Sequence, residues 1–186
     1  MRNRIMIKTM EAMNMSGLKF TMADLAREMG VSKSTLYENF RSKEELIGAI
    51  TDTIMSDLRQ QDFAIRQNNN LSFNEKLQFL LVSYPKILGP IDDRVIDDIQ
   101  RYMPQEWARI KQFLDERWQN IEQLIGQGID NGLVRPINMA VLRKLFIGAN
   151  NELFDYQFLI QNGIILNDAL TAMAEVLMFG IMVPSE

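Results

Sequence analysis

Hydrophobic residues recur at helical spacing along almost the whole of this 186-residue chain, and the alternation typical of strands is scarce. We predict helices over residues 3–15, 22–29, 33–40, 43–66, 72–88, 92–103, 104–130, 139–161 and 166–181. Pro85 is expected to kink the fifth of these helices. The pattern therefore predicts an all-α protein of about nine helices.

Polar and glycine-containing segments separate these helices. The run Gln67-Asn68-Asn69-Asn70 is the clearest break, and Gly89-Pro90 is another. The three short helices near the N-terminus are expected to form a small domain over 1–50. The longer helices are expected to form a second domain over 51–186, and a chain of this length and 47% hydrophobic content can bury a core in each.

Composition excludes several classes of chemistry. The chain contains no cysteine and no histidine, which removes thiolate sites, the commonest metal ligand and the usual general base. The net charge of −4 is uneven: residues 1–50 hold eight Lys and Arg against six Asp and Glu, whereas the remainder is acidic. This asymmetry modestly favours an anionic partner for the N-terminal part.

Residues 21–46, TMADLAREMGVSKSTLYENFRSKEEL, have the pattern of two short helices joined by a tight turn. Thr21 and Asp24 form a capping-box pattern at the start of the first helix, and Ser32 is the expected N-cap of the second. Between the helices, Gly30 supplies the positive φ that a tight turn requires. This arrangement is the format of a helix-turn-helix that binds DNA.

The second helix of this motif has one apolar and one polar side. Leu36 and Phe40 lie four residues apart and mark the side that packs inward. Side chains on the other sides would enter a major groove, and the predicted contacts are Lys33, Ser34, Thr35, Tyr37 and Glu38. Phosphate contacts are predicted for Thr21, Tyr37 and Lys43, since exposed helix N-termini favour anions. A purely structural explanation stays open here, because capped, crossed helices also occur in bundles that bind no DNA.

The segment GVSKSTLYENFRSKEEL, with the preceding TMADLARE, resembles the signature of the tetracycline-repressor (TetR/AcrR) family of bacterial regulators. The matching residues are Ala26, Gly30, Val31, Ser32, Thr35, Leu36, Tyr37, Phe40, Lys43, Glu44 and Leu46. The resemblance implies an N-terminal helix-turn-helix domain followed by a C-terminal helical domain that binds a ligand and dimerises. It also implies a homodimer that represses transcription from a palindromic operator and is released by a small molecule.

The last two long helices would form the dimer interface by analogy with this family. Apolar residues on them that require a partner are Leu142, Leu145, Phe146, Ala149, Leu153, Leu170, Met173 and Leu177. The alternative is that these residues face only the core of their own domain.

Large, soft side chains are concentrated in the C-terminal part, where an effector would bind. The predicted ligand-binding residues are Phe79, Met103, Trp107, Phe113, Phe146, Asn150 and Phe154. Aromatic residues at helical spacing are more often core, so that alternative also stands. The acidic residues Asp92, Asp93, Asp97 and Asp98 are interpreted as a solvated helix start rather than a metal site.

These observations favour a DNA-binding regulator over an enzyme, and no cofactor or metal is expected. The expected partners are double-stranded DNA, a second copy of the chain and an unknown small-molecule effector, with no membrane. A cytoplasmic location is expected because no apolar run reaches the roughly 18–20 residues of a membrane span. The alternative function is an effector-independent architectural or protein-interaction protein of the same fold.

Overall fold

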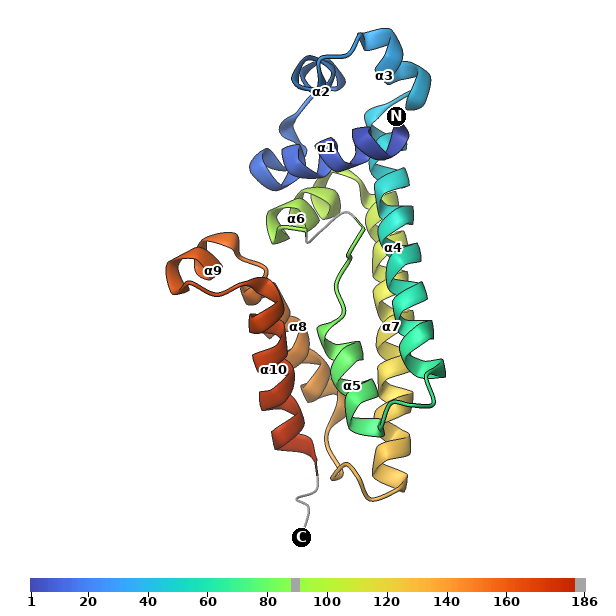
Figure 1. Ribbon diagram of the computed structural model, residues 1–186, viewed down its shortest axis with the longest axis vertical. Helices are drawn as coiled ribbons and strands as arrows, with labels where there is room; N and C mark the ends of the chain where they lie inside the picture. Colours follow the sequence, from blue (N-terminus) through green and yellow to red (C-terminus); the bar gives the residue numbers. More distant parts are fainter. Residues whose placement is uncertain (88–90, 183–186) are drawn as a thin grey trace. The chain divides into compact units, whose positions relative to one another are not determined.

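The computed structural model describes residues 1–87 and 91–182, which form ten α-helices and one 3₁₀ turn (Figure 1). The elements are α1 (Arg2–Ser16), η1 (Gly17–Lys19), α2 (Met22–Met29), α3 (Lys33–Asn39), α4 (Lys43–Gln67), α5 (Phe73–Val82), α6 (Asp93–Tyr102), α7 (Pro104–Asp130), α8 (Met139–Leu153), α9 (Tyr156–Asn162) and α10 (Leu166–Ile181). Within the described ranges, strand-like pairing is limited to one isolated bridge between Val134 and Met182. The predicted all-α class is confirmed. None of the described helices is both long and apolar enough to cross a membrane.

The fifth helix is shorter than the hydrophobic pattern predicts. α5 ends at Val82, and residues 83–87 are not helical. Proline lacks a backbone N–H, and its ring disfavours the helical conformation of the preceding residue. Pro85 therefore follows the end of the helix instead of kinking it, and that prediction was wrong. Leu88 and the predicted break at Gly89-Pro90 lie outside the described residues.

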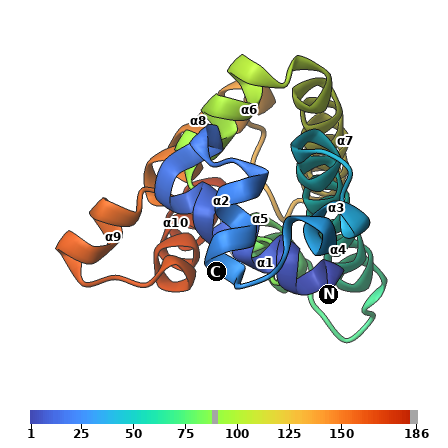
Figure 2. The ribbon, with the colours of Figure 1, turned by 90° about the horizontal axis from the view of Figure 1, so that it is seen from above.

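The single helix predicted over 139–161 is two helices. α8 ends at Leu153, and the side chain of Asp155 accepts a 2.8 Å hydrogen bond from the backbone N–H of Gln157 as the N-cap of α9. Figures 1 and 2 show α9 turned away from the axis of α8. Aspartate is a preferred N-cap, so Asp155 starts a new helix although the apolar pattern continues through the junction.

The described helices fall into two compact units by their contacts. Unit 1 contains residues 1–58 and 84–111, and unit 2 contains residues 59–83 and the chain from 112 onward. In unit 1 the chain returns to the N-terminal helices through α6, which packs on α1 and η1. The predicted functional division into 1–50 and 51–186 stays a prediction.

The core of unit 1 joins its N-terminal helices to α6. Fully or almost fully buried side chains in it are Ile5, Met10, Leu25, Leu36, Phe40, Leu46, Ile47, Ile50, Val95 and Ile99. Because α2 and α3 each contribute to this core, their orientation is set by packing as well as by the turn between them.

The core of unit 2 is formed mainly by α5, α7, α8 and α10. Its buried members are Leu77, Leu80, Leu81, Trp118, Ile121, Ile125, Val134, Leu142, Ala174 and Ile181. Beside it, Arg117 on α7 forms a 2.7 Å ion pair with Asp62 on α4, a residue that is only 5% exposed. Arg117 also donates to the carbonyl oxygen of Leu80 at 3.3 Å, near the end of α5. Arg117 therefore links three helices of unit 2, α4, α5 and α7.

Candidate DNA-binding site

The turn between α2 and α3 has the geometry that its sequence predicts. The Thr21 side chain accepts a 3.1 Å hydrogen bond from the Asp24 backbone N–H, and the Asp24 carboxylate accepts from the backbone N–H and hydroxyl of Thr21. These hydrogen bonds lower the pKa of Asp24 below its usual value. Gly30 has φ 65° and ψ 32°, and the next residue, Val31, donates its backbone N–H to the carbonyl oxygen of Ala26 at 3.0 Å. Local interactions therefore fix both the start and the end of α2.

Helix α3 is short and is anchored on its inner side. Ser32 caps it by accepting a 3.0 Å hydrogen bond from the backbone N–H of Thr35. Leu36 and Phe40 are both fully buried in the core of unit 1. The pair predicted to point inward is thus the part of α3 that holds the helix in place.

The outer side of α3 carries the residues predicted to contact base edges. Lys33, Ser34, Tyr37 and Glu38 are exposed, and Thr35 is half-buried. The Ser34 hydroxyl donates to the Glu38 carboxylate at 3.2 Å, so these two side chains are paired across one turn of the helix. The structure therefore brings the predicted residues of α3 together on one polar surface.

Arg2, which the sequence did not indicate as part of the site, contacts the C-terminal end of α3. The guanidinium of Arg2 donates to the carbonyl oxygen of Asn39, the last residue of α3, and lies 4.0 Å from the centroid of the Phe40 ring. A cation at a helix C-terminus satisfies a free carbonyl and interacts favourably with the helix dipole. Arg2 is 37 positions from Asn39, so no local pattern could have indicated this contact.

Lys43, predicted as a phosphate contact, has its ammonium engaged within unit 1. It donates to the backbone carbonyl oxygens of Leu18 and of Phe20, the latter at 2.9 Å, and lies 4.5 Å from the centroid of the Phe20 ring. Burial lowers the pKa of this ammonium below its usual value. Thr21, in contrast, is exposed at the start of α2.

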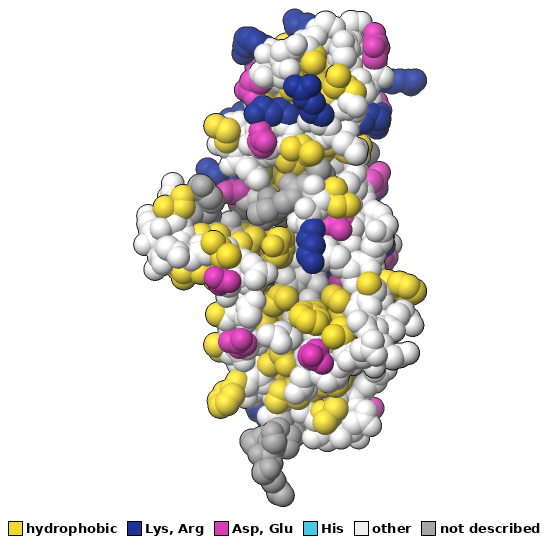
Figure 3. All heavy atoms as spheres, viewed as in Figure 1, with side chains coloured by type: hydrophobic (Ala, Val, Ile, Leu, Met, Phe, Trp, Pro, Cys, Tyr) yellow, Lys and Arg dark blue, Asp and Glu magenta, His cyan; other side chains and the backbone are white. Residues whose placement is uncertain are grey.

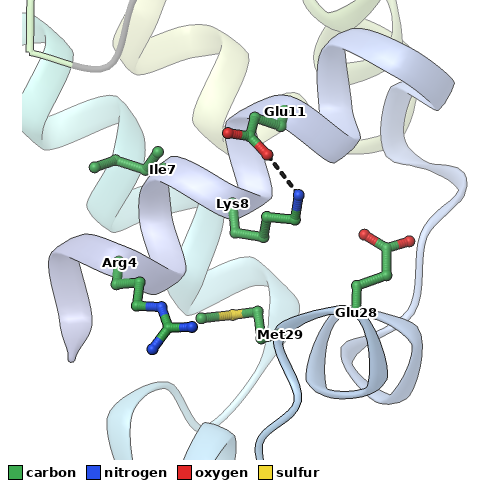
Figure 4. A pocket seen from close by; sticks show the side chains of 6 residues that line it. All are labelled: Arg4, Ile7, Lys8, Glu11, Glu28 and Met29. Carbon is green, nitrogen blue, oxygen red and sulfur yellow. Dashed lines mark hydrogen bonds and ion pairs between the residues drawn. The ribbon is translucent and has the colours of Figure 1, made fainter.

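Basic side chains gather over the N-terminal helices in the space-filling view (Figure 3), and on the face shown they do not form one continuous patch. A surface pocket of about 370 Å³ lies between α1 and α2, lined by Arg4, Ile7, Lys8, Glu11, Glu28 and Met29 (Figure 4). Lys8 donates to Glu11 at 2.6 Å, and Glu28 lies across the pocket from them. With two acidic and two basic side chains, this pocket has no excess charge to attract a phosphate group.

Two of the acidic residues near the start of α6, Asp92 and Asp98, have structural partners. Asp92 caps α6 and pairs with Arg94 at 2.7 Å, and this hydrogen bond is the main cause of its lowered pKa. Asp98 accepts from the backbone N–H of Leu18 at 2.7 Å, and Asp97 is exposed. The side chain of Asp93 lies outside the described residues. Among the described side chains, no group of three potential ligands is placed to hold a metal ion.

The residues predicted to bind an effector are divided between the two units. Met103 and Trp107 belong to unit 1, and Phe79, Phe113, Phe146, Asn150 and Phe154 belong to unit 2. Of those in unit 2, Phe113 is buried and Phe79 is exposed. The contribution of this set to a ligand site stays a prediction.

One group within unit 2 combines an aromatic surface with a polar group. Phe146 stacks on Trp118 with ring centroids 5.5 Å apart and an interplanar angle of 29°. Asn150 donates to the Phe146 carbonyl oxygen at 2.9 Å and lies 3.7 Å from the sulfur of Met173. Phe146 and Asn150 are each half-buried, and Phe146 packs against the core of unit 2.

Helices α8 and α10 expose apolar side chains that the sequence did not single out. Of the residues predicted to face a partner, Leu142, Leu170 and Met173 are buried within unit 2, whereas Leu145 is 58% exposed. The most exposed apolar residues of α10 are instead Val176, at 74%, and Phe179, at 91%. Both the inner and the outer sides of these helices carry apolar residues, so the pattern alone could not distinguish one side from the other.

Comparisons with known proteins agree with this geometry. Residues 8–50 match the model of a family described as bacterial regulatory proteins, tetR family. The chain is 26% identical over its full 186 residues to YvaF, an uncharacterised HTH-type transcriptional regulator of Bacillus subtilis (strain 168), of which it covers 98%. Helix-turn-helix regulators thus match the N-terminal helices in particular and the chain as a whole.

Solved structures with the same fold include the ketosteroid transcriptional regulator KstR2 of Mycobacterium tuberculosis. The TM-score is 0.80 at 16% identity, over 98% of this chain and 95% of KstR2. A TetR transcriptional regulator from Chloroflexus aurantiacus J-10-FL gives a TM-score of 0.75 at 21% identity, over 98% of this chain and 96% of that one. At these identities the similarity establishes the shared fold.

Proposed function

We propose that this chain, which belongs to the tetR family of bacterial regulatory proteins, is a ligand-responsive repressor that binds a palindromic operator as a homodimer. The observation that carries the proposal is the exposed polar side of α3, on a helix whose opposite side is fully buried and whose start is capped. A helix presented in this way is suited to the major groove of DNA.

The proposed contacts follow from the exposure and chemistry of the side chains. Ser34 and Thr35 offer hydroxyl groups to base edges or phosphates, and the Tyr37 ring offers an apolar surface to a thymine methyl group. Glu38 can accept from a cytosine amino group when its hydrogen bond with Ser34 opens. Lys33 and the exposed start of α2 at Thr21 supply phosphate contacts.

Dimerisation is proposed through the outer sides of α8 and α10. The exposed apolar residues Val141, Leu145, Val176 and Phe179 lie on these two helices, which pack against each other in unit 2. A single helix-turn-helix covers too little DNA for tight specific binding, so two copies related by a two-fold axis are needed. Two-fold symmetry in the protein requires a palindromic operator.

Control by a small molecule is supported by the group around Phe146. An apolar ligand could contact the half-buried Phe146 ring, which stacks on the buried Trp118, while the Asn150 amide fixes its orientation. Such a ligand would release DNA by binding more tightly to a conformation in which the two helix-turn-helix motifs no longer match the operator spacing.

The DNA-binding part is tested by selection from fragmented genomic DNA at low salt. The full chain should retain a small set of fragments that share a palindrome, and its affinity should fall steeply as salt is raised. The control is Leu36→Ala, which removes a buried side chain from the core that holds the helix-turn-helix. Failure of the wild-type chain to enrich any fragment would overturn the proposal.

The effector part is tested separately on the selected operator. A library of small apolar compounds is screened for those that raise the melting temperature of the protein, and each hit is tested for release of the operator. Release by a stabilising compound, lost in Asn150→Leu, supports control through this group. If compounds release DNA equally from wild type and Asn150→Leu, the proposed location is wrong.

A further inference from the structure

The connection between α1 and α2 determines where α2 begins. It consists of the turn η1, Phe20 and Thr21, and it starts at Gly17, which has φ 63°. Because Thr21 is the N-cap of α2, any displacement of this connection also moves the start of α2. The contacts that hold these residues therefore affect the geometry of the proposed DNA-binding surface.

Charged side chains from two other helices hold the backbone of Leu18. Asp98 on α6 accepts its N–H at 2.7 Å, and Lys43 at the start of α4 donates to its carbonyl oxygen. Lys43 also donates to the Phe20 carbonyl oxygen at 2.9 Å. Hydrogen bonds with a charged partner are stronger than those between neutral groups, so these contacts restrain the connection.

The sequence around Leu18 fits this arrangement. A side chain at Gly17 would place its Cβ atom 2.1 Å from a carboxylate oxygen of Asp98, so glycine allows the carboxylate to approach the backbone. The aliphatic part of Lys43 brings its ammonium close to the Phe20 ring. Burial lowers the pKa of this ammonium, and the charges of Glu44 and Asp98 partly oppose that effect. The Lys43 ammonium thus donates to two backbone carbonyl oxygens of unit 1.

We propose that Lys43 and Asp98 are positioning residues for DNA binding, which hold the Leu18 backbone from two sides and thereby place Thr21 and α2 against the phosphates. This inference rests on the proposed function. Lys43 acts through the protein backbone and not by contacting a phosphate, and Asp98 makes α6 part of the DNA-binding unit.

Replacing Asp98 tests whether it acts only through its charge or as a positioning residue, because the two roles predict opposite changes in DNA affinity. If Asp98 acted only through its charge, Asp98→Ala would remove repulsion from DNA and tighten binding. As a positioning residue it should weaken binding about ten-fold or more. Asp97→Ala is the matched control, since it removes the same charge from an exposed neighbouring position on α6. Its affinity should equal or slightly exceed that of the wild type.

The salt dependence of binding separates the two roles of a lysine. Lys33→Met should make the slope of log affinity against log salt concentration less steep. The change should correspond to the loss of about one phosphate contact. Lys43→Met, which keeps the aliphatic stem, should weaken binding about ten-fold or more while the slope stays that of the wild type. The double variant Lys43→Met/Asp98→Ala should bind little worse than either single variant, because both act on the same segment.

These measurements use the full chain and the operator that it selects, with melting temperatures recorded for every variant. A merely structural role would lower the melting temperature and leave the affinity of the folded protein unchanged. If Asp98→Ala does not fold, Asp98→Asn replaces it, and weaker binding than wild type is again expected. The inference is overturned if the Asp98 variant binds as tightly as Asp97→Ala, or if Lys43→Met lowers the salt slope as Lys33→Met does. Failure of the wild-type chain to select any operator would instead overturn the proposed function.

Discussion

Helices α2 and α3 in unit 1 and helices α8 and α10 in unit 2 each present one side to solvent, but the chemistry of the two surfaces differs. The outer side of α3 carries hydroxyl and charged groups, whereas those of α8 and α10 carry Leu145, Val176 and Phe179. A polar side on a firmly anchored helix suits DNA, and an apolar side suits a second protein surface. The two surfaces are both helical, but their chemistry favours different kinds of partner.

The largest effect is expected from breaking the buried ion pair of unit 2. Arg117→Met should lower the free energy of unfolding by about 3–5 kcal/mol, because it leaves the buried carboxylate of Asp62 without its charged partner. Urea denaturation measures this change. The control is Glu116→Gln, which removes the exposed partner of Arg59 at 3.9 Å and should cost less than about 1 kcal/mol. Equal losses in the two variants would show that Asp62 is not effectively buried.

A smaller effect is expected at the apolar surface of α10. Phe179→Glu should weaken dimerisation about a hundred-fold, because a charge would replace a large, exposed apolar side chain in the proposed interface. Sedimentation over a range of protein concentrations measures the dissociation constant. Phe63→Glu is the control, since Phe63 is an exposed aromatic residue on α4. The surface assignment is wrong if both variants, or neither, become monomeric.

The two capping boxes offer a matched comparison between the units. Thr21 with Asp24 caps α2, and Ser72 with Glu75 caps α5 in the same geometry. Thr21→Ala and Ser72→Ala should each cost about 1 kcal/mol of stability by thermal unfolding. Only Thr21→Ala should also weaken operator binding, because only Thr21 lies beside the proposed DNA surface. Equal operator affinity in the two variants would remove Thr21 from that surface.

The smallest effect is expected in how the stability contributed by a capping box changes with pH. Hydrogen bonds from Ser72 lower the pKa of Glu75 from its usual 4.5, so the ionised carboxylate stabilises the folded state above the unfolded-state pKa. That contribution is lost as pH falls through the lowered folded-state pKa. The difference in melting temperature between wild type and Glu75→Gln should therefore shrink from pH 6 towards about pH 3. A constant difference would show that the carboxylate charge contributes nothing.

The two regions also differ in how far their structure could be predicted from the sequence. The bounds of α2 and the capped start of α3 were predictable because each determinant, Thr21, Gly30 and Ser32, acts within a few residues. The contacts of Arg2 with Asn39 and of Lys43 with Leu18 were not, since they join residues 37 and 25 positions apart. Long-range contacts of this kind depend on the packed structure and leave no local pattern.

In unit 2 the structure could not be fully predicted from the sequence for a different reason. Leu142 and Leu145 lie on the same apolar helix, and only packing decides that the first is buried and the second exposed. The break at Asp155 was missed because hydrophobic periodicity continues across it, although aspartate is itself a capping signal. The error at Pro85 was the opposite one. The hydrophobic pattern continues past Val82, but α5 ends there, because proline disfavours a helical conformation of the residue before it.

The central claim, that α3 reads an operator as part of a symmetric dimer, is tested most directly by selecting bound duplexes from a random DNA library. The wild type should yield a palindromic consensus. Ser34→Ala and Glu38→Gln should each change the preferred bases at the same position of both half-sites, with little change in melting temperature. An unchanged consensus in both variants, or a wild-type consensus without two-fold symmetry, would contradict the account.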